Sequence, residues 1–116
     1  MALPKHLRFP NRRLVRAAMT YGQRLPSPLG TLWLSRPPDG RGRVHFIVST
    51  RVSKKSTVRH RLQRQLDGWA ARRWAASPPP VSILVLVHPA AAASGRGELT
   101  RRAEAMGRVI LRRVQP

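Results

Sequence analysis

The chain has 116 residues, of which 41% are hydrophobic, and this length and composition predict one folded domain spanning residues 1–116 and exclude a disordered basic tail. Lys and Arg number 23 against 4 Asp and Glu, and the net charge of +19 favours a polyanionic partner, nucleic acid above all, because self-repulsion on this scale opposes folding. Cysteine is absent from the sequence, which excludes disulfides and zinc fingers, and the longest apolar run, residues 81–87, is too short to span a bilayer.

A short helix is predicted near the N-terminus. Asn11 can cap a helix over residues 12–21, in which Val15 and Met19 recur at the spacing of one helical face, and Gly22 ends it. The stretch lacks the apolar core of a secretory signal, but it is rich in Arg and free of acids, as a mitochondrial transit peptide is. It leads directly into a strand-like run, so we expect it to belong to the fold, with organellar import left open.

Two strands are predicted next, joined by a turn. Residues 29–35 are strand-like, residues 36–43 are rich in Pro and Gly, and the Asp39-Gly40 pair favours a tight reversal. Residues 44–50 are then expected to form the antiparallel partner, in which Phe46 and two valines share one face. The predicted unit is a β-hairpin.

A long and strongly basic helix is predicted over residues 56–76. Its apolar residues recur at steps of four, four and three and define one buried stripe: Val58, Leu62, Leu66 and Trp69. Arg59 and Arg61 border this stripe, whereas His60 and Arg64 point roughly away from it. The helix is therefore expected to be half core and half cationic surface.

The C-terminal third predicts a buried strand and a last helix. Residues 81–88 form a nearly unbroken apolar run, which is typical of a central strand buried on both faces. Residues 98–113 repeat apolar side chains at helical spacing, beginning with Leu99 and ending with Ile110. The predicted order is helix, two strands, helix, strand, helix.

The four acidic residues and the four histidines are dispersed along the chain. A nuclease that holds divalent metal needs clustered carboxylates, so we predict no catalytic residue and no metal site in this chain. Any chemistry is expected to belong to a partner.

The segment over residues 49–66, STRVSKKSTVRHRLQRQL, resembles the protein component of bacterial ribonuclease P. That family carries a strand ending in Ser-Lys-Lys-Val, a short basic linker and a helix that starts Arg-Asn-Arg-Val-Lys-Arg. The run ILVLVHPAAA and the final amphipathic helix follow in the family's order, and Trp33 falls where the family has a strand aromatic. The similarity therefore covers essentially the whole chain.

The chain departs from the family pattern at Thr50, His60 and Gln63, and Val15 and Met19 stand where the family has paired phenylalanines. The resemblance implies an α/β (α+β) two-layer sandwich of the ribosomal protein S5 domain 2-like class, in the order α-β-β-(β)-α-β-α. It also implies a left-handed βαβ crossover, against the right-handed rule that about 98% of such connections obey.

The function implied by the resemblance is that of the ribonuclease P protein subunit, which binds the catalytic RNA and the 5′ leader of precursor tRNA during 5′ maturation. Contacts to the RNA subunit are expected from the basic motif: Arg51, Lys54, Lys55, Arg59, His60, Arg61 and Arg64. A leader-binding cleft is expected along the first helix and the sheet, lined by Trp33, Phe46, Val15 and Met19. The RNA would hold Mg²⁺ and act as the catalyst, and we expect neither a membrane nor an obligatory protein partner. The resemblance also implies a protein of the bacterial cytoplasm.

Two other interpretations stay open. A small basic ribosomal or other structural RNA-binding protein would share this size and charge, and composition does not separate the two. A nuclease acting alone is the second, and the dispersed acids argue against it. The RNA that copurifies with the chain would discriminate, because ribosomal RNA would support the first.

Overall fold

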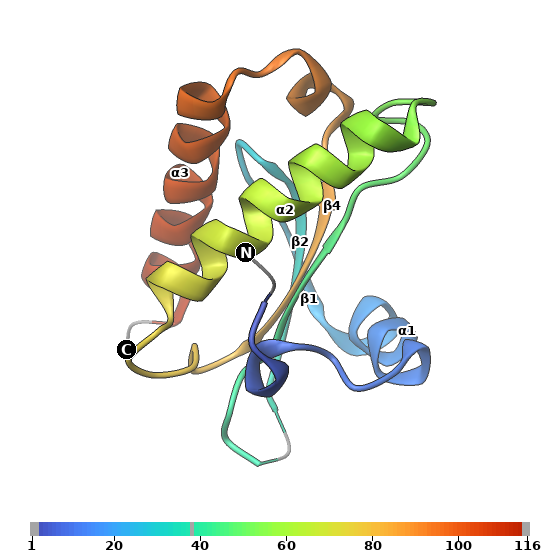
Figure 1. Ribbon diagram of the computed structural model, residues 1–116. Helices are drawn as coiled ribbons and strands as arrows, with labels where there is room; N and C mark the ends of the chain where they lie inside the picture. The colour runs from blue at the N-terminus through green and yellow to red at the C-terminus, as the bar shows by residue number, and fades with distance from the viewer. Residues whose placement is uncertain (1–2, 38, 115–116) are drawn as a thin grey trace.

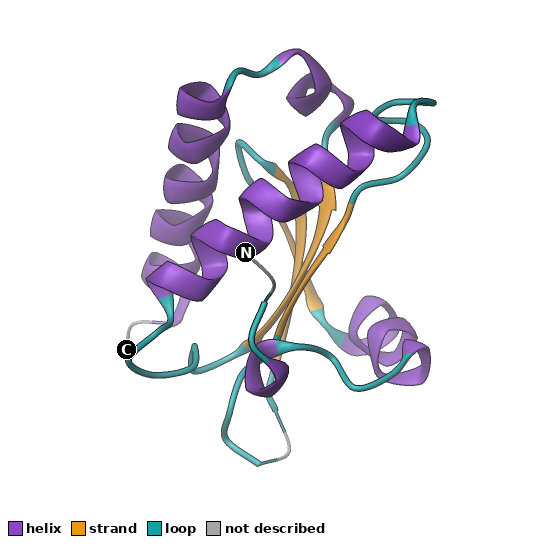
Figure 2. Ribbon diagram, viewed as in Figure 1, coloured by secondary structure: helices purple, strands orange, loops and turns teal. Residues whose placement is uncertain are grey.

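The computed structural model describes residues 3–37 and 39–114, and its centre is a four-stranded sheet (Figures 1 and 2). The strands lie in the order β1-β2-β4-β3, with bounds Gln23–Pro26 for β1, Gly30–Ser35 for β2, Val44–Ile47 for β3 and Ser82–Val87 for β4. β2 is antiparallel to both β1 and β4, whereas β3 is parallel to β4. β4 is thus an interior strand buried along almost its whole length, as its apolar run predicted.

The α-helices are α1 (Arg12–Tyr21), α2 (Ser56–Arg73) and α3 (Arg96–Val114), and 3-10 turns lie at Lys5–Leu7 and Pro89–Ala93. α1 begins where predicted, because the Asn11 side chain accepts a hydrogen bond of 3.0 Å from the backbone N–H of Leu14. α2 begins where predicted and ends at Arg73 rather than at residue 76. All three predicted helices are confirmed.

The core lies between the sheet and the pair of helices α2 and α3, which cover one face (Figure 2). The apolar stripe of α2 and the inner face of α3 are buried there, together with alternate residues of the strands. Trp69 and Trp74 pack edge to face near the end of α2, with ring centroids 5.4 Å apart. Because the apolar stripe of α2 faces the sheet, the arginines of this helix lie along the margins of the stripe and on the outer side of the helix.

α1 lies on the opposite face of the sheet, at the end marked by Ser35 and Ser82 (Figure 1). The chain enters β1 directly from this helix through Gly22. A Cβ at Gly22 would collide with the carbonyl oxygen of Ala18 in the last turn of α1 and lie 3.3 Å from the Cβ of Trp33, so glycine lets the chain leave the helix tightly and pass close to β2. The predicted two-layer arrangement corresponds to the sheet and the α2–α3 pair. α1 partly covers the other face of the sheet.

The predicted hairpin of residues 29–35 and 44–50 is wrong. β3 pairs in parallel with β4, and β4 lies between β2 and β3. A strand that is apolar on both faces lies inside a sheet, with a hydrogen-bonded neighbour on each side. The chain just before β3 already lies alongside the start of β4. There Gly42 N–H donates to the Pro79 carbonyl at 2.9 Å, and Ile83 N–H donates to the Arg43 carbonyl at 2.7 Å.

β1 takes the place beside β2 that the hairpin prediction gave to residues 44–50. The implied order α-β-β-(β)-α-β-α placed an additional strand third, in brackets, whereas the additional strand of the structure, β1, comes first in the chain. The segment β3–α2–β4 forms a parallel βαβ unit between neighbouring strands, and the left-handed course of its crossover stays a prediction.

Candidate nucleic-acid interface

One face of the sheet is covered by α1 at one end only. Its side chains alternate with those of the core, and we call them the open sheet face: Thr31, Trp33, Ser35, His45, Ile47, Leu84 and Leu86. β2 contributes six residues to this sheet, so the face is about 20 Å long at ~3.3 Å per residue. Leu84 is fully buried, and the other six residues offer a mixed apolar and polar surface on the side away from α2 and α3.

Trp33 and Phe46 lie on opposite faces of the sheet. Trp33 is half-buried on the open sheet face, and the guanidinium carbon of Arg24 lies 6.0 Å from its ring centroid, in range of a cation–π interaction. Phe46 is 1% exposed and belongs to the core, so the expectation that it lines a cleft is wrong. Alternation along β3 puts His45 on the open sheet face instead, where its ring packs against Phe9 at 6.3 Å between centroids.

A hollow of about 210 Å³, the α1 hollow, lies between α1 and the adjacent end of the sheet. The α1 residues Leu14 and Tyr21 line it and are 40% and 85% exposed, so two large side chains remain in solvent at its rim. Val15 is half-buried and Met19 is 38% exposed, and neither lines the hollow. The sequence interpretation missed Tyr21, although its seven-residue spacing from Leu14 places both on one helical face.

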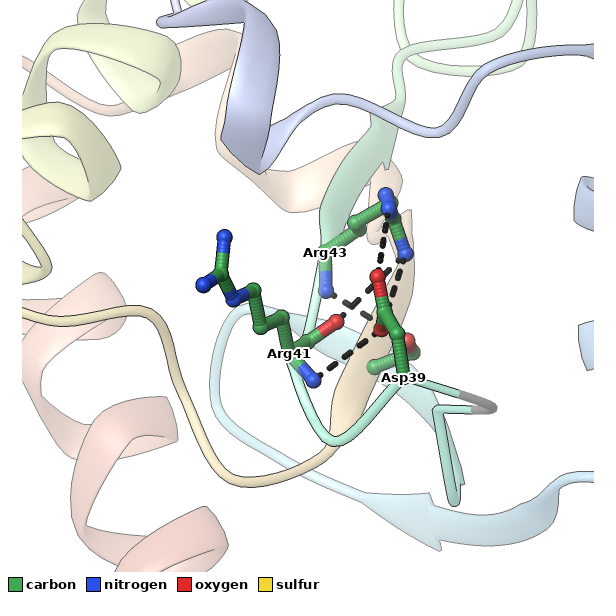
Figure 3. Close-up of polar contacts among 4 residues, drawn as sticks. Asp39, Arg41 and Arg43 are labelled. Carbon is green, nitrogen blue, oxygen red and sulfur yellow. Dashed lines mark hydrogen bonds and ion pairs between the residues drawn. The ribbon is translucent and has the colours of Figure 1, made fainter.

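The α1 hollow is bordered by a turn that Asp39 organises (Figure 3). The Asp39 carboxylate accepts hydrogen bonds of 3.1 Å from the backbone N–H of Arg41 and of 3.1 Å from Nη2 of Arg43. These two bonds hold the pKa of Asp39 below its usual value. The ion pair fixes the Arg43 guanidinium beside the hollow, a role that sequence reasoning did not assign.

The basic motif lies at the other end of the sheet, where β3 ends and α2 begins (Figure 1). Residues 49–55, the basic loop, are anchored in the core by Val52, which is 6% exposed. The hydroxyl of Ser53 accepts a hydrogen bond of 3.2 Å from the N–H of Lys55. Six of the predicted RNA-binding residues are exposed in and after this loop: Arg51, Lys54, Lys55, His60, Arg61 and Arg64.

Arg59, the seventh residue, is half-buried and turned back onto the basic loop. Its Nη1 donates to the carbonyl oxygens of Ser53 at 2.9 Å and of Lys54 at 3.0 Å. A charged donor shared by two consecutive carbonyls fixes the backbone that carries Lys54 and Lys55. Arg59 therefore acts as a positioning residue, which the sequence pattern did not reveal.

A second hollow, of about 260 Å³, joins the basic loop to the open sheet face. We call it the Arg51 hollow; its lining includes Ser49 and Arg51 from the loop and Thr31 and Leu86 from the sheet. Because β2 and β4 run from this hollow toward Ser35 and Ser82, the Arg51 hollow and the α1 hollow lie at opposite ends of one face.

One titratable pair lies at the sheet edge beside α2. Burial lowers the pKa of the His45 imidazole, and the charge of Asp67 opposes this shift. Burial raises the pKa of Asp67, and the hydrogen bond of 3.2 Å that Gln63 Nε2 donates to its carboxylate opposes this shift.

Within residues 3–37 and 39–114, no group of three His, Cys, Asp or Glu side chains is placed to hold a metal ion. In the same ranges no helix combines the length and apolar character needed to cross a bilayer.

Comparison with known proteins supplies the family. The model of the ribonuclease P family matches residues 3–110. The chain belongs to the ribonuclease P family. A search among curated proteins gave no match.

Solved structures of ribonuclease P proteins share the fold. A Staphylococcus aureus RNase P protein, a mutant described as defective in mRNA degradation activity, aligns with a TM-score of 0.80 at 12% identity over 90% of this chain and 88% of its own. The RNase P protein from Thermotoga maritima aligns with a TM-score of 0.74 at 16% identity over 94% of this chain and 98% of its own. At these identities the likeness concerns the fold.

Membership in the ribonuclease P family places the chain in tRNA processing, as a protein subunit of an RNA-based endoribonuclease that associates with ribonuclease P RNA. The alternative of a ribosomal protein is not favoured.

Proposed function

We propose that this chain binds the catalytic RNA through the basic loop and the start of α2, and guides the 5′ leader of precursor tRNA across the open sheet face. The observation that carries the proposal is the junction of the two surfaces at the Arg51 hollow, which residues of both line. Phosphate contacts fix position without reading sequence, which suits a partner of many precursors.

The leader would run from the Arg51 hollow past Trp33 to the α1 hollow. A base stacked on an aromatic ring contributes about 1–3 kcal/mol. Trp33 lies at the centre of this path, and Tyr21 and the half-buried Phe9 lie at its far end, where both line the α1 hollow. Val15 and Met19 of α1 remain candidates to flank this path, although aliphatic side chains do not stack on bases as aromatic rings do.

The chemistry is proposed to belong to the RNA subunit, with Mg²⁺ held by its phosphates. The acidic side chains of the described residues support this division, because two of them are engaged in ion pairs: Asp39 with Arg43 and Glu98 with Arg102. The protein would instead screen phosphate repulsion where catalytic RNA, leader and protein converge.

Cleavage of a precursor tRNA by the cognate RNA subunit, with and without this chain across a Mg²⁺ series, tests the proposal. We expect strong stimulation at low Mg²⁺, weak stimulation at high Mg²⁺, and no site-specific cleavage by the protein without RNA. Cleavage by the protein alone would overturn the division of labour. Stimulation that stays constant across the series would mean that charge screening does not explain the effect.

A further inference from the structure

A groove between α2 and α3 gathers arginines away from the open sheet face. It has a volume of about 450 Å³, and its walls come from both helices: Arg64, Gln65, Gly68 and Arg72 of α2, and Arg96 and Thr100 of α3. We call it the arginine groove. The positions of Arg64, Gly68 and Arg72 recur every four residues, so they share one face of α2 beside the start of α3.

The cations of the arginine groove lack acidic partners. Among the described residues, neither ion pair involves Arg64, Arg72 or Arg96, and no side-chain hydrogen bond engages their guanidinium groups. Arg96 is the first residue of α3, where the helix dipole disfavours a positive charge. Three guanidinium groups around one hollow repel each other, and an anion between them relieves this repulsion.

Gly68 forms part of the groove and has no packing requirement to be glycine. A Cβ built there would meet only the Nη1 of Arg72, at 3.4 Å, which is the far end of a flexible side chain. Glycine is a poor helix former, so its use in the middle of an 18-residue helix goes against local stability. Its effect is to leave room beside Arg72 and between the two helices.

We propose that the arginine groove binds a stretch of phosphodiester backbone of the RNA subunit. The proposal rests on the function proposed above and extends it to Arg72, Arg96 and Thr100, which lie outside the basic motif. The RNA subunit is favoured over the leader because the groove lies on the helical side of the molecule, and Arg64 belongs both to the groove and to the cationic surface at the start of α2. Guanidinium forks suit the oxygens of consecutive phosphates, and the Thr100 hydroxyl can add a further hydrogen bond.

Salt-dependent binding of the RNA subunit, without precursor tRNA, tests the arginine groove. The variant Arg72→Ala/Arg96→Ala is compared with Arg101→Ala/Arg112→Ala, which removes the same charge from exposed positions of α3 outside the groove. We expect the groove variant to lower the log–log salt slope by about 1.4–1.8, or about 0.7–0.9 for each lost phosphate contact, and the control to change it much less. Equal slopes for the two variants would overturn the groove proposal. A wild-type chain that does not bind the RNA subunit would overturn the proposed function itself.

Gly68→Ala provides a test in which every charge is kept. The added methyl group favours the helix and fills space in the groove 3.4 Å from Nη1 of Arg72, where a phosphate would otherwise approach, so we expect a higher melting temperature together with several-fold weaker binding of the RNA subunit. A stabilised variant that binds as the wild type does would show that the groove is not occupied by RNA.

Discussion

Replacing Arg59 with Ala is expected to loosen the basic loop rather than simply to remove one cation. The side chain makes hydrogen bonds of 2.9 Å and 3.0 Å to the carbonyls of Ser53 and Lys54. A hydrogen bond contributes about 0.5–1.5 kcal/mol net, and the half-exposed position of Arg59 puts the pair near the lower end, at about 1 kcal/mol together. If ordering of the loop is required for binding, this loss weakens affinity for the RNA subunit about fivefold.

The matched control is Arg61→Ala. Arg61 is exposed, and its removal should lower the log–log salt slope by about 0.7–0.9, as for one lost phosphate contact, without any change in the loop. Arg59→Lys keeps the charge and separates the charge of the side chain from its geometry.

Amide hydrogen exchange over residues 53–55 and salt-dependent binding of the RNA subunit distinguish the two roles. Exchange should accelerate in Arg59→Ala and stay unchanged in Arg61→Ala. If Arg59→Ala leaves exchange unchanged and reproduces the slope change of Arg61→Ala, Arg59 is an ordinary phosphate contact and the positioning argument is refuted.

Three further outcomes are expected. Trp33→Ala and Tyr21→Ala should each weaken binding of precursor tRNA with a long leader more than binding of mature tRNA, and equal losses in filter binding would remove the residue from the leader path. Gly22→Ala should lower the melting temperature in circular dichroism, because its Cβ collides with the Ala18 carbonyl; an unchanged value would contradict the close approach. The pKa of His45 is lowered on folding, so the unfolded chain takes up the proton first as the pH falls through 6.5, and stability should decline from pH 7 to pH 5. Urea titrations should show that the free energy of unfolding falls less between pH 7 and pH 5 in His45→Gln than in the wild type. An equal fall in both would exclude His45 as the source of the pH dependence.

The helices and the central strand could be predicted from periodicity because their burial patterns are local. The stripe of α2 and the inner face of α3 each repeat at helical spacing, and both are buried. β1, QRLP, has one half-buried residue and three exposed ones, and so it shows no alternation that a sequence pattern could detect.

Strand pairing and side-chain function depended on contacts between distant parts of the chain. The turn signal at Asp39-Gly40 predicted a hairpin, but pairing of residues 42–47 with β4 outweighed it. Phe46 has an aromatic ring of the kind that stacks on bases. The alternation of side chains along β3 shows that Phe46 and His45 lie on opposite faces of the sheet, but it does not show which of the two faces is covered by helices. Arg59 looks like its neighbours in sequence, and only the fold of the basic loop brings the carbonyls of Ser53 and Lys54 within reach.

Two of the four acidic residues of this basic chain, Asp39 and Glu98, position cations more than they neutralise the proposed RNA surfaces. Asp39 and Glu98 each pair with an arginine four residues later, at 3.1 Å and 3.3 Å, and Arg102 also donates to the Pro28 carbonyl at 2.9 Å. Such exposed pairs add little stability, but they fix the direction of a guanidinium group. By contrast, no ion pair among the described residues involves Arg61, Arg64 or the other cations of the basic motif. An acidic partner at these positions would have to be displaced before a phosphate could bind. Without such partners, the positive charge of the basic motif is available to RNA. The repulsion among these cations in the free protein is then relieved by their attraction to phosphates in the complex.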